Sequence, residues 1–142
     1  MSINEIRQKI VPYFKKKKGI VAIYLFGSVI GASYGAKSKP DIDIAILLDK
    51  DNPYRDNLEA KFRISEDLER LLDKKSEEID VIILNDAAPV LVHEVIKTGD
   101  ILWEKDREKR VDFEVTAELE YYDTKPLREF FWEKLTKEIR KK

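Results

Sequence analysis

The spacing of apolar positions near the N terminus predicts an amphipathic helix followed by a buried strand. Four apolar residues recur at three- and four-residue steps: Ile3, Ile6, Ile10 and Phe14. This spacing places them on one face of a helix, which ends in the lysine run 15–18 and Gly19. Residues 20–26 form a short apolar run rich in β-branched and aromatic side chains, which is typical of a buried strand.

Two further strands are predicted on either side of a second helix. Residues 41–48 have apolar side chains on one side and, by the two-residue period of a strand, the following residues on the other: Asp41, Asp43, Ala45 and Leu47. Residues 79–84 form the third predicted strand. Between the two strands, an apolar stripe predicts a helix: Leu58, Phe62, Leu68 and Leu72. A strand, a helix of this length and a strand fit a right-handed crossover between parallel strands.

The C-terminal third is predicted to be mainly helical. Residues 89–97 read as a short helix that ends at Gly99, and residues 101–103 as a short edge strand. Two apolar stripes follow: Val111, Val115, Leu119 and Tyr122, then Leu127, Phe131, Leu135 and Ile139. Pro126 lies between the stripes and predicts two separate helices. Aromatic residues gather in this region: Tyr121, Tyr122, Phe130, Phe131 and Trp132. We expect most of them to pack in the core, and one or two to face a partner or a second copy of the chain.

Together these elements predict an α/β or α+β fold with helices in its C-terminal part. The length of 142 residues suits a single domain, 1–142. Within it we expect a catalytic half of about residues 1–104 and a helical part of about residues 105–142.

The composition narrows the classes of function. Charged residues make up 39% of the chain, but the net charge is only -1, so direct binding of nucleic acid is not expected. The chain has no Cys and a single His, His93, which excludes thiol nucleophiles and sites that need two imidazoles. No apolar run approaches the roughly 18 residues of a membrane span, and residues 1–18 do not resemble a signal peptide. We therefore expect a cytoplasmic protein without membrane contact.

A Gly-Ser turn and a pair of acids carry the predicted chemistry. Gly27-Ser28 follows the first strand, and Asp41-Ile42-Asp43 opens the second. The Cα atoms of the two acids would lie about 6.6 Å apart on one face, where their charges repel unless a cation lies between them. Oxygen ligands without nearby His or Cys favour Mg²⁺, or Mn²⁺ in its place. Gly27 allows a close approach of the backbone, and the Ser28 hydroxyl and neighbouring amides can donate to phosphate. A nucleotide is therefore the expected ligand.

Each of these residues also has a simpler structural interpretation. Asp41 and Asp43 could mark a solvated strand entry, Ser28 could cap a helix, and Asp80 could begin a strand. The combination favours the catalytic interpretation, because a Gly-Ser turn and two acids at a strand end form a joint pattern. Asp80, near the start of the third strand, would then reach the same edge of the sheet.

The Gly27-Ser28 and Asp41-Ile42-Asp43 pattern resembles the signature of the DNA polymerase β-like nucleotidyltransferase superfamily, and the size is similar to its minimal branch. The resemblance implies an α+β fold with a small mixed sheet and helices packed on one face. It also implies two magnesium ions and transfer of a nucleoside monophosphate from ATP or another triphosphate, with release of pyrophosphate. It also implies that Asp41 and Asp43 bind metal, and that Asp80 matches the third acid, which helps deprotonate the attacking hydroxyl. Gly27 and Ser28 would then bind the nucleotide.

The C-terminal part is similar to the minimal nucleotidyltransferase antitoxins that are encoded beside HEPN-domain ribonuclease toxins. The similarity rests on residues 89–103, 110–114 and 121–123. It implies a toxin partner and transfer of AMP to a toxin tyrosine, which blocks RNA cleavage. Two alternatives stay open: transfer to a small hydroxylated molecule, and an inactive antitoxin that acts by contact alone. The second is kept because the family's usual Arg after Gly-Ser is missing and Pro40 precedes Asp41.

Overall fold

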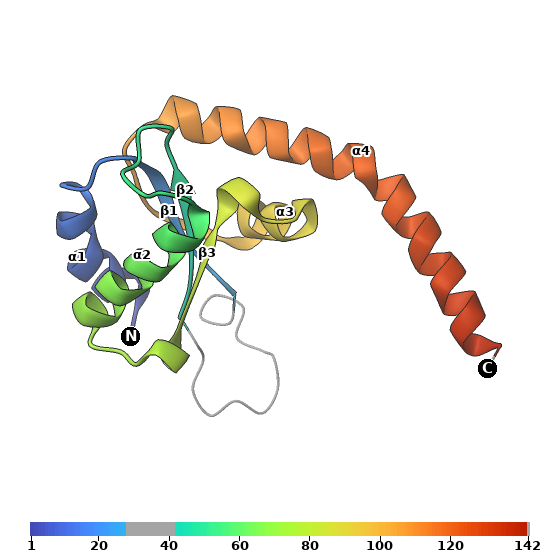
Figure 1. Cartoon of the computed structure of the whole chain (residues 1–142), viewed down its shortest axis with the longest axis horizontal. Helices are drawn as coiled ribbons and strands as arrows, with labels where there is room; N and C mark the ends of the chain where they lie inside the picture. Colours follow the sequence, from blue (N-terminus) through green and yellow to red (C-terminus); the bar gives the residue numbers. More distant parts are fainter. Residues whose placement is uncertain (28–41, 142) are drawn as a thin grey trace.

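The fold is built from four strands and four α-helices in the computed structural model, which describes residues 1–27 and 42–141. The helices are α1 Ile3–Phe14, α2 Asn57–Leu72, α3 Pro89–Thr98 and α4 Arg107–Arg140. The strands are β1 Ile20–Phe26, β2 Ile42–Leu48, β3 Ile79–Ile83 and β4 Asp100–Glu104. Two short 3₁₀ turns, η2 Ser76–Glu78 and η3 Leu84–Asp86, flank β3. Figure 1 shows α4 running across the domain and continuing beyond it.

The sheet is mixed, as the sequence predicts. Its strand order is β3-β2-β1-β4. The pair β2 and β3, which α2 connects, is parallel, whereas β1 pairs antiparallel with both β2 and β4. The predicted α+β class and the predicted crossover between parallel strands are therefore confirmed, and β3 and β4 form the two edges.

Helices α1 and α2 cover one face of the sheet. The buried face of α2 consists of residues at four-residue steps: Ala60, Ile64, Leu68 and Leu72. Only half of the predicted stripe was therefore correct, because Leu58 and Phe62 are 77% and 66% exposed. Because the face that packs on the sheet contains Ala60 and not Leu58, the side chains of Leu58 and Phe62 lie on the opposite side of the helix and point to solvent.

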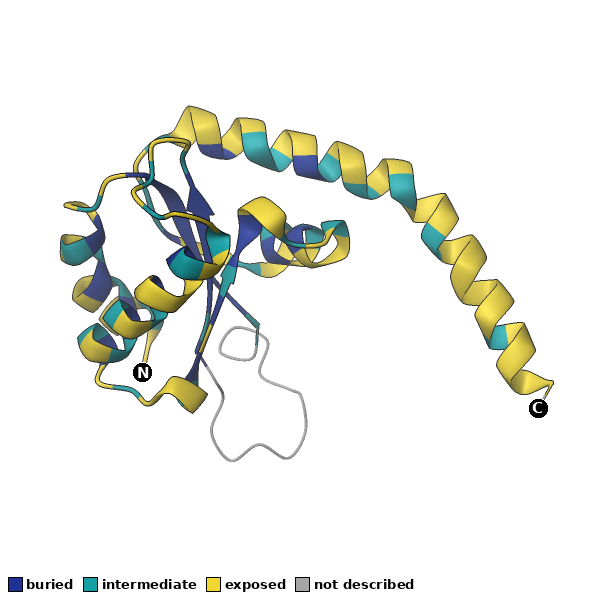
Figure 2. Cartoon of the chain, viewed as in Figure 1, coloured by how far each residue is buried: buried dark blue, intermediate teal, exposed yellow. Residues whose placement is uncertain are grey.

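Helices α3 and α4 add a second helical layer on the other face. Their buried residues, Val92 and Val95 of α3 and Ala117 of α4, share a core with Tyr24 and Phe26 of β1. Figure 2 shows this division: the sheet is buried, and most of α4 is exposed. The resemblance implied helices on one face, whereas in the structure helices cover both faces, because α3 and the first half of α4 pack on the side opposite α1 and α2.

The C-terminal region forms one helix rather than the two that Pro126 predicted. Helix α4 runs from Arg107 to Arg140 with Pro126 inside it. A proline inside a helix removes one backbone hydrogen bond and clashes with the carbonyl four residues earlier, which can bend the helix without ending it. Figure 1 shows such a bend where α4 leaves the domain. Although α4 is long, no helix within residues 1–27 and 42–141 is apolar enough over a sufficient length to cross a bilayer.

The expected core packing of the C-terminal aromatics is wrong. Tyr122, Phe130, Phe131 and Trp132 are each more than half exposed, and the stripe that begins at Val111 and Val115 faces solvent as well. Tyr121 is half-buried because it stacks on His93 of α3, with ring centroids 3.7 Å apart. Within the described residues, the sheet and α3 are too small to cover a 34-residue helix, so half of α4 is left exposed.

A buried charge network fixes the first half of α4 to the sheet. The Arg110 guanidinium donates to carboxylates of Glu104, at the end of β4, and of Glu114, one turn along α4. Glu114 also accepts a 2.8 Å hydrogen bond from the Tyr24 hydroxyl on β1. Burial and the Glu114 carboxylate raise the pKa of Tyr24 far above its usual value. Burial opposes ionisation of Arg110, but the hydrogen bonds that its guanidinium donates to Glu114 and Glu104 raise its pKa overall.

Replacing Arg110 with Ala is expected to lower the free energy of unfolding by about 3–5 kcal/mol, because it leaves two carboxylates without their cation. Arg107→Ala, at an exposed position of the same helix, is the matched control and should change it by less than about 0.5 kcal/mol. Urea unfolding followed by circular dichroism measures both. If the free energy of unfolding falls by the same amount in both variants, the charge network does not hold α4 on the sheet.

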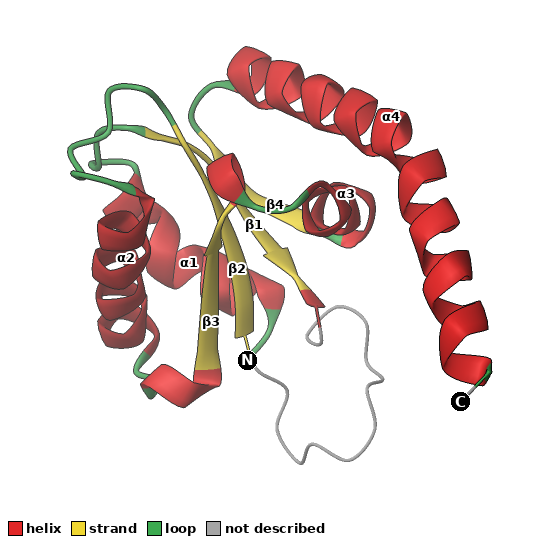
Figure 3. Cartoon of the chain, turned by 45° about the vertical axis from the view of Figure 1, so that its right-hand side comes forward, coloured by secondary structure: helices red, strands yellow, loops and turns green. Residues whose placement is uncertain are grey.

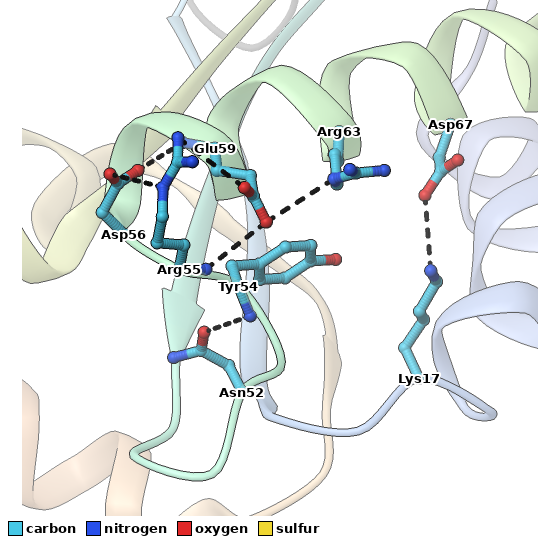
Figure 4. Close-up of polar contacts among 8 residues, drawn as sticks. All are labelled: Lys17, Asn52, Tyr54, Arg55, Asp56, Glu59, Arg63 and Asp67. Carbon is cyan, nitrogen blue, oxygen red and sulfur yellow. Dashed lines mark hydrogen bonds and ion pairs between the residues drawn. The ribbon is translucent and has the colours of Figure 1, made fainter.

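The loop between β2 and α2 is ordered by short-range polar contacts, shown in Figure 4. The backbone amide of Tyr54 donates to the Asn52 side chain at 3.1 Å. Asp56 caps α2 by accepting a 2.8 Å hydrogen bond from the Glu59 amide, and Glu59 contacts Arg63 at 3.6 Å. This loop lies at the end of the sheet where β2 finishes.

Two carboxylates in and beside this loop predict how stability depends on pH. Lys109 lowers the pKa of Asp49 through a 2.7 Å hydrogen bond, and the Glu59 amide lowers the pKa of Asp56. Both groups therefore stabilise the fold above their unfolded pKa of about 4, and this contribution is lost as the pH falls through the folded values. At pH 7 the native chain should have a higher free energy of unfolding than Asp56→Ala. The two free energies should converge as the pH falls below about 4. A difference that stays constant over that range would contradict the assignment of the cap.

Candidate active site

The candidate site lies at the end of the sheet opposite the Asn52 loop. Because β1 runs antiparallel to β2 while β3 runs parallel to it, the end of β1 meets the starts of β2 and β3 there (Figure 3). The backbone register aligns Phe26 of β1 with Asp43 of β2, and Asp43 with Asp80 of β3. Residues distant in sequence are thus brought into one row across three strands.

Asp43 and Asp80 point to the same face of the sheet. Asp43 shares its side of β2 with Ala45, and Asp80 shares its side of β3 with Ile82; both apolar residues belong to or pack against the α3–α4 core. Aligned residues on neighbouring strands lie about 4.8 Å apart, which is close enough for their carboxylates to share a cation. Asp43 is half-buried, whereas Asp80 is exposed on the edge strand. The pair therefore offers one anchored carboxylate and one that an incoming molecule can reach.

Gly27 packs directly against the carboxylate of Asp43. Its backbone has φ +78°, in the region that favours glycine. A Cβ atom added at this position would lie 2.1 Å from Oδ2 of Asp43. The position thus requires glycine for two reasons: the turn after β1 and the room for a carboxylate on the next strand.

Three of the five predicted site residues lie within the described residues. Gly27, Asp43 and Asp80 come together at one end of the sheet. Ser28 and Asp41 lie outside the described residues, so their positions stay predictions. The catalytic and metal-binding roles of the three aspartates, and the nucleotide-binding roles of Gly27 and Ser28, also stay predictions.

The donor set at the site consists of carboxylate oxygens. In the part of the chain that the structure describes, Asp43 and Asp80 form a pair, and no cluster of three or more acidic, His or Cys side chains is assembled. His93 lies elsewhere: its Nδ1 is 2.8 Å from Glu118, and it joins α3 to α4. Hard oxygen donors without imidazole or thiolate fit Mg²⁺ or Mn²⁺.

Two features of the site were not predicted from the sequence: the contact between Gly27 and Asp43, and the position of a further acid, Asp100, outside the site. The contact between Gly27 and Asp43 depends on how β1 and β2 are aligned, which spacing along the chain does not reveal. Asp100 opens β4 at the same end of the sheet, but its aligned partner is Leu25, which belongs to the core under α1 and α2. Asp100 therefore faces away from Asp43 and Asp80.

Comparison with known families decides the class of this site. The family model described as Polymerase beta, Nucleotidyltransferase matches residues 8–108, well over half of the chain. The chain belongs to this nucleotidyltransferase family. The matched segment contains Gly27, Asp43 and Asp80, and it confirms the expected enzyme class, nucleotidyltransferase. Among curated proteins, no sequence matches this chain.

Solved structures with this nucleotidyltransferase fold include several toxin–antitoxin complexes. A toxin–antitoxin structure with AMP-PNP is 25% identical, with TM-score 0.71, and the match covers 92% of this chain and 98% of the other. A structure of the tri-AMPylated Shewanella oneidensis HEPN toxin in complex with MNT antitoxin is 24% identical, with TM-score 0.71 and coverage of 95% and 99%. The toxin–antitoxin MntA–HepT is 24% identical, with TM-score 0.69 and coverage of 94% and 98%. These neighbours confirm the fold over nearly the whole chain.

Proposed function

We propose that this nucleotidyltransferase is a magnesium-dependent antitoxin that transfers AMP from ATP to a tyrosine of a cognate HEPN ribonuclease toxin. The observation that carries the proposal is the row formed by Gly27, Asp43 and Asp80 inside a nucleotidyltransferase fold. It is supported by structural neighbours that are toxin–antitoxin complexes, one of them with an AMPylated HEPN toxin. A chain without Cys that uses ATP also suits the cytoplasm.

The carboxylates suit two Mg²⁺ ions, with Mn²⁺ as a substitute. Asp41 and Asp43 would hold the ions, and Asp80 would complete the set beside the acceptor. Magnesium usually binds through one or two carboxylates together with substrate phosphates. When bound, the ions neutralise the triphosphate and stabilise the charge on the leaving pyrophosphate.

The protein groups position the two substrates and accept one proton. The backbone amides at Gly27 and Ser28, with the Ser28 hydroxyl, would donate hydrogen bonds to the triphosphate. Asp80 lies on an edge strand and is exposed, so a tyrosine hydroxyl of a second protein can approach it. The tyrosine oxygen then attacks the α-phosphorus, the bond between the α- and β-phosphates breaks, and the phenolic proton passes to Asp80. The products are pyrophosphate and the toxin with AMP on its tyrosine.

Labelled ATP tests the proposal. The chain is incubated with Mg²⁺, a purified HEPN toxin and ATP labelled on either the α- or the γ-phosphate. The α-label is expected on the toxin and the γ-label in pyrophosphate, and EDTA should prevent both. Loss of the toxin's ribonuclease activity without any label on it would contradict the proposal and favour an antitoxin that acts by contact alone. Label on an added aminoglycoside instead of the toxin would favour a small hydroxylated acceptor.

A further inference from the structure

The second half of α4, residues 125–141, exposes an unusual number of large apolar side chains; we call it the arm. Six of them are between 52% and 73% exposed: Leu127, Phe130, Phe131, Trp132, Leu135 and Ile139. Figure 2 shows that the arm is exposed on nearly all sides as it leaves the domain. Apolar surface of this extent on a soluble domain marks a site of interaction.

Part of the arm continues the helix face that packs on the domain. Three residues line the inner face of the first half: Phe113, Ala117 and Tyr121, all buried or half-buried. Phe131, Leu135 and Ile139 follow them at the same four-residue steps, about five full turns further along the helix. They therefore point in nearly the same direction around the helix axis, but past the end of α3, where Figure 1 shows no helix or strand of the described residues beside α4.

The arm also differs in charge from the rest of the chain. Together with the Lys142 that follows it, the arm contains seven basic and three acidic side chains, a net charge of +4 for residues 125–142. Since the whole chain has a net charge of -1, residues 1–124 carry -5. A surface that covers the arm must therefore be apolar at its centre and tolerate or supply negative charge at its rim.

A second copy of the chain fits the arm poorly. Two arms packed together would bring like charges of +4 side by side, which disfavours their association. Of the exposed apolar residues outside α4, Leu58 and Phe62 are the most exposed, and they lie on α2, on the face of the sheet opposite α4. A contact of the arm with α2 would join two different surfaces, which forms a closed dimer only if both arms reach across a two-fold axis to the far face of the partner's sheet. A different protein is the better occupant.

We propose that the arm is the docking surface for the acceptor protein of the proposed reaction, which presents an apolar groove bordered by carboxylates. This inference rests on the proposed function. Structural neighbours solved as toxin–antitoxin structures cover 92% to 95% of this chain, so the match extends well past residue 108, where the family model ends, and into α4. The arm is thus part of the fold that those antitoxins share.

The direction of the arm links docking to the reaction. In Figures 1 and 3 the arm turns from the first half of α4 toward the end of the sheet where β2 and β3 begin, which is the end that carries Asp43 and Asp80. A protein bound along the arm is therefore held on the side of the candidate site. Holding the acceptor there raises its effective concentration at the reacting phosphate.

The test compares Leu135→Asp on the arm with Leu119→Asp, an equally exposed leucine of α4 before the arm. Calorimetry without ATP measures the Kd for the purified HEPN toxin. Leu135→Asp is expected to raise this Kd at least about tenfold and Leu119→Asp less than about twofold, because a charge in an apolar contact is poorly tolerated. In the labelling assay Leu135→Asp should raise KM for the toxin and leave kcat and ATP binding unchanged. Thermal unfolding checks that both variants fold.

The outcomes separate this inference from the proposed function. If toxin binding depends on Leu135 but the native chain transfers no AMP, the arm is supported as the docking surface and the proposed function is contradicted. Equal affinity of the two variants, while the native chain transfers AMP, would overturn the arm and leave the function intact. A native chain that dimerises on its own, and becomes monomeric in Leu135→Asp, would also overturn the inference, because the occupant would then be a second copy.

Discussion

Replacing Asp43 with Asn is expected to lower AMP transfer to the toxin at least about a thousandfold, the scale of a lost electrostatic group in a catalytic site. The amide keeps the shape of the side chain but loses the negative charge that a divalent cation requires. Asp43 is half-buried at the centre of the row and contacts Gly27 and aligns with Asp80, so no neighbouring side chain of the described row has the same position. The measurement is the initial rate of α-label incorporation at saturating ATP and Mg²⁺.

Asp100→Asn is the matched control for this substitution. Asp100 lies at the same end of the sheet and is exposed, but it faces the side of α1 and α2. Its rate should stay within about twofold of the native chain, because surface changes away from a site have small effects. Thermal unfolding of both variants excludes loss of fold as the cause. Native rates in Asp43→Asn would remove Asp43 from the site.

Replacing Gly27 with Ala is expected to lower the rate at least about a hundredfold. The new Cβ would lie 2.1 Å from Oδ2 of Asp43, so the carboxylate must move away from its position beside Asp80. A displacement of about 1 Å in a reacting group can cost this much in rate. The φ of +78° adds strain of about 1–2 kcal/mol, which should appear as a loss of stability.

Gly19→Ala separates strain from the effect on the site. Gly19 has a similar φ of +84°, and a Cβ there would meet Asn52 in the loop at the other end of the sheet. This variant should lose stability as Gly27→Ala does but keep its kcat when assayed at a temperature where it is folded. If both variants lose kcat alike, the defect comes from the fold and the contact between Gly27 and Asp43 has no catalytic importance.

The sequence was sufficient to predict the strands and the parallel pairing of β2 with β3, but not the antiparallel pairing of β1 with β2 and β4. The β-branched runs and the connecting helix α2 indicated parallel β2 and β3, because such a crossover has few alternatives. The sequence also indicated that Asp80 would approach Asp43, since acids at the starts of two parallel strands lie at the same end of the sheet. The close contact between Gly27 and Asp43 was not predictable, because it depends on the register of two strands.

Side-chain exposure in the helices was harder to predict than the helices themselves. Leu58 and Phe62 fit a stripe with Leu68 and Leu72, but the helix buries Ala60 and Ile64 instead. A small residue such as Ala60 gives little signal in an apolar pattern, although it allows close packing. Pro126 suggested that α4 would end there, but the helix continues and bends, which relieves the clash of the proline ring with the preceding turn. Apolar stripes on α4 suggested a core, whereas their burial requires a facing surface that the described part of the chain does not provide.

The position of bound metal tests the central claim most directly. Crystals of the chain grown with Mn²⁺ and a non-hydrolysable ATP analogue would give an anomalous signal at each metal. We expect the strongest peak within coordination distance of the Asp43 carboxylate, on the face of the sheet that it shares with Asp80, with phosphate oxygens completing the shell. A nucleotide bound with its metal at any other place on the protein would contradict the account.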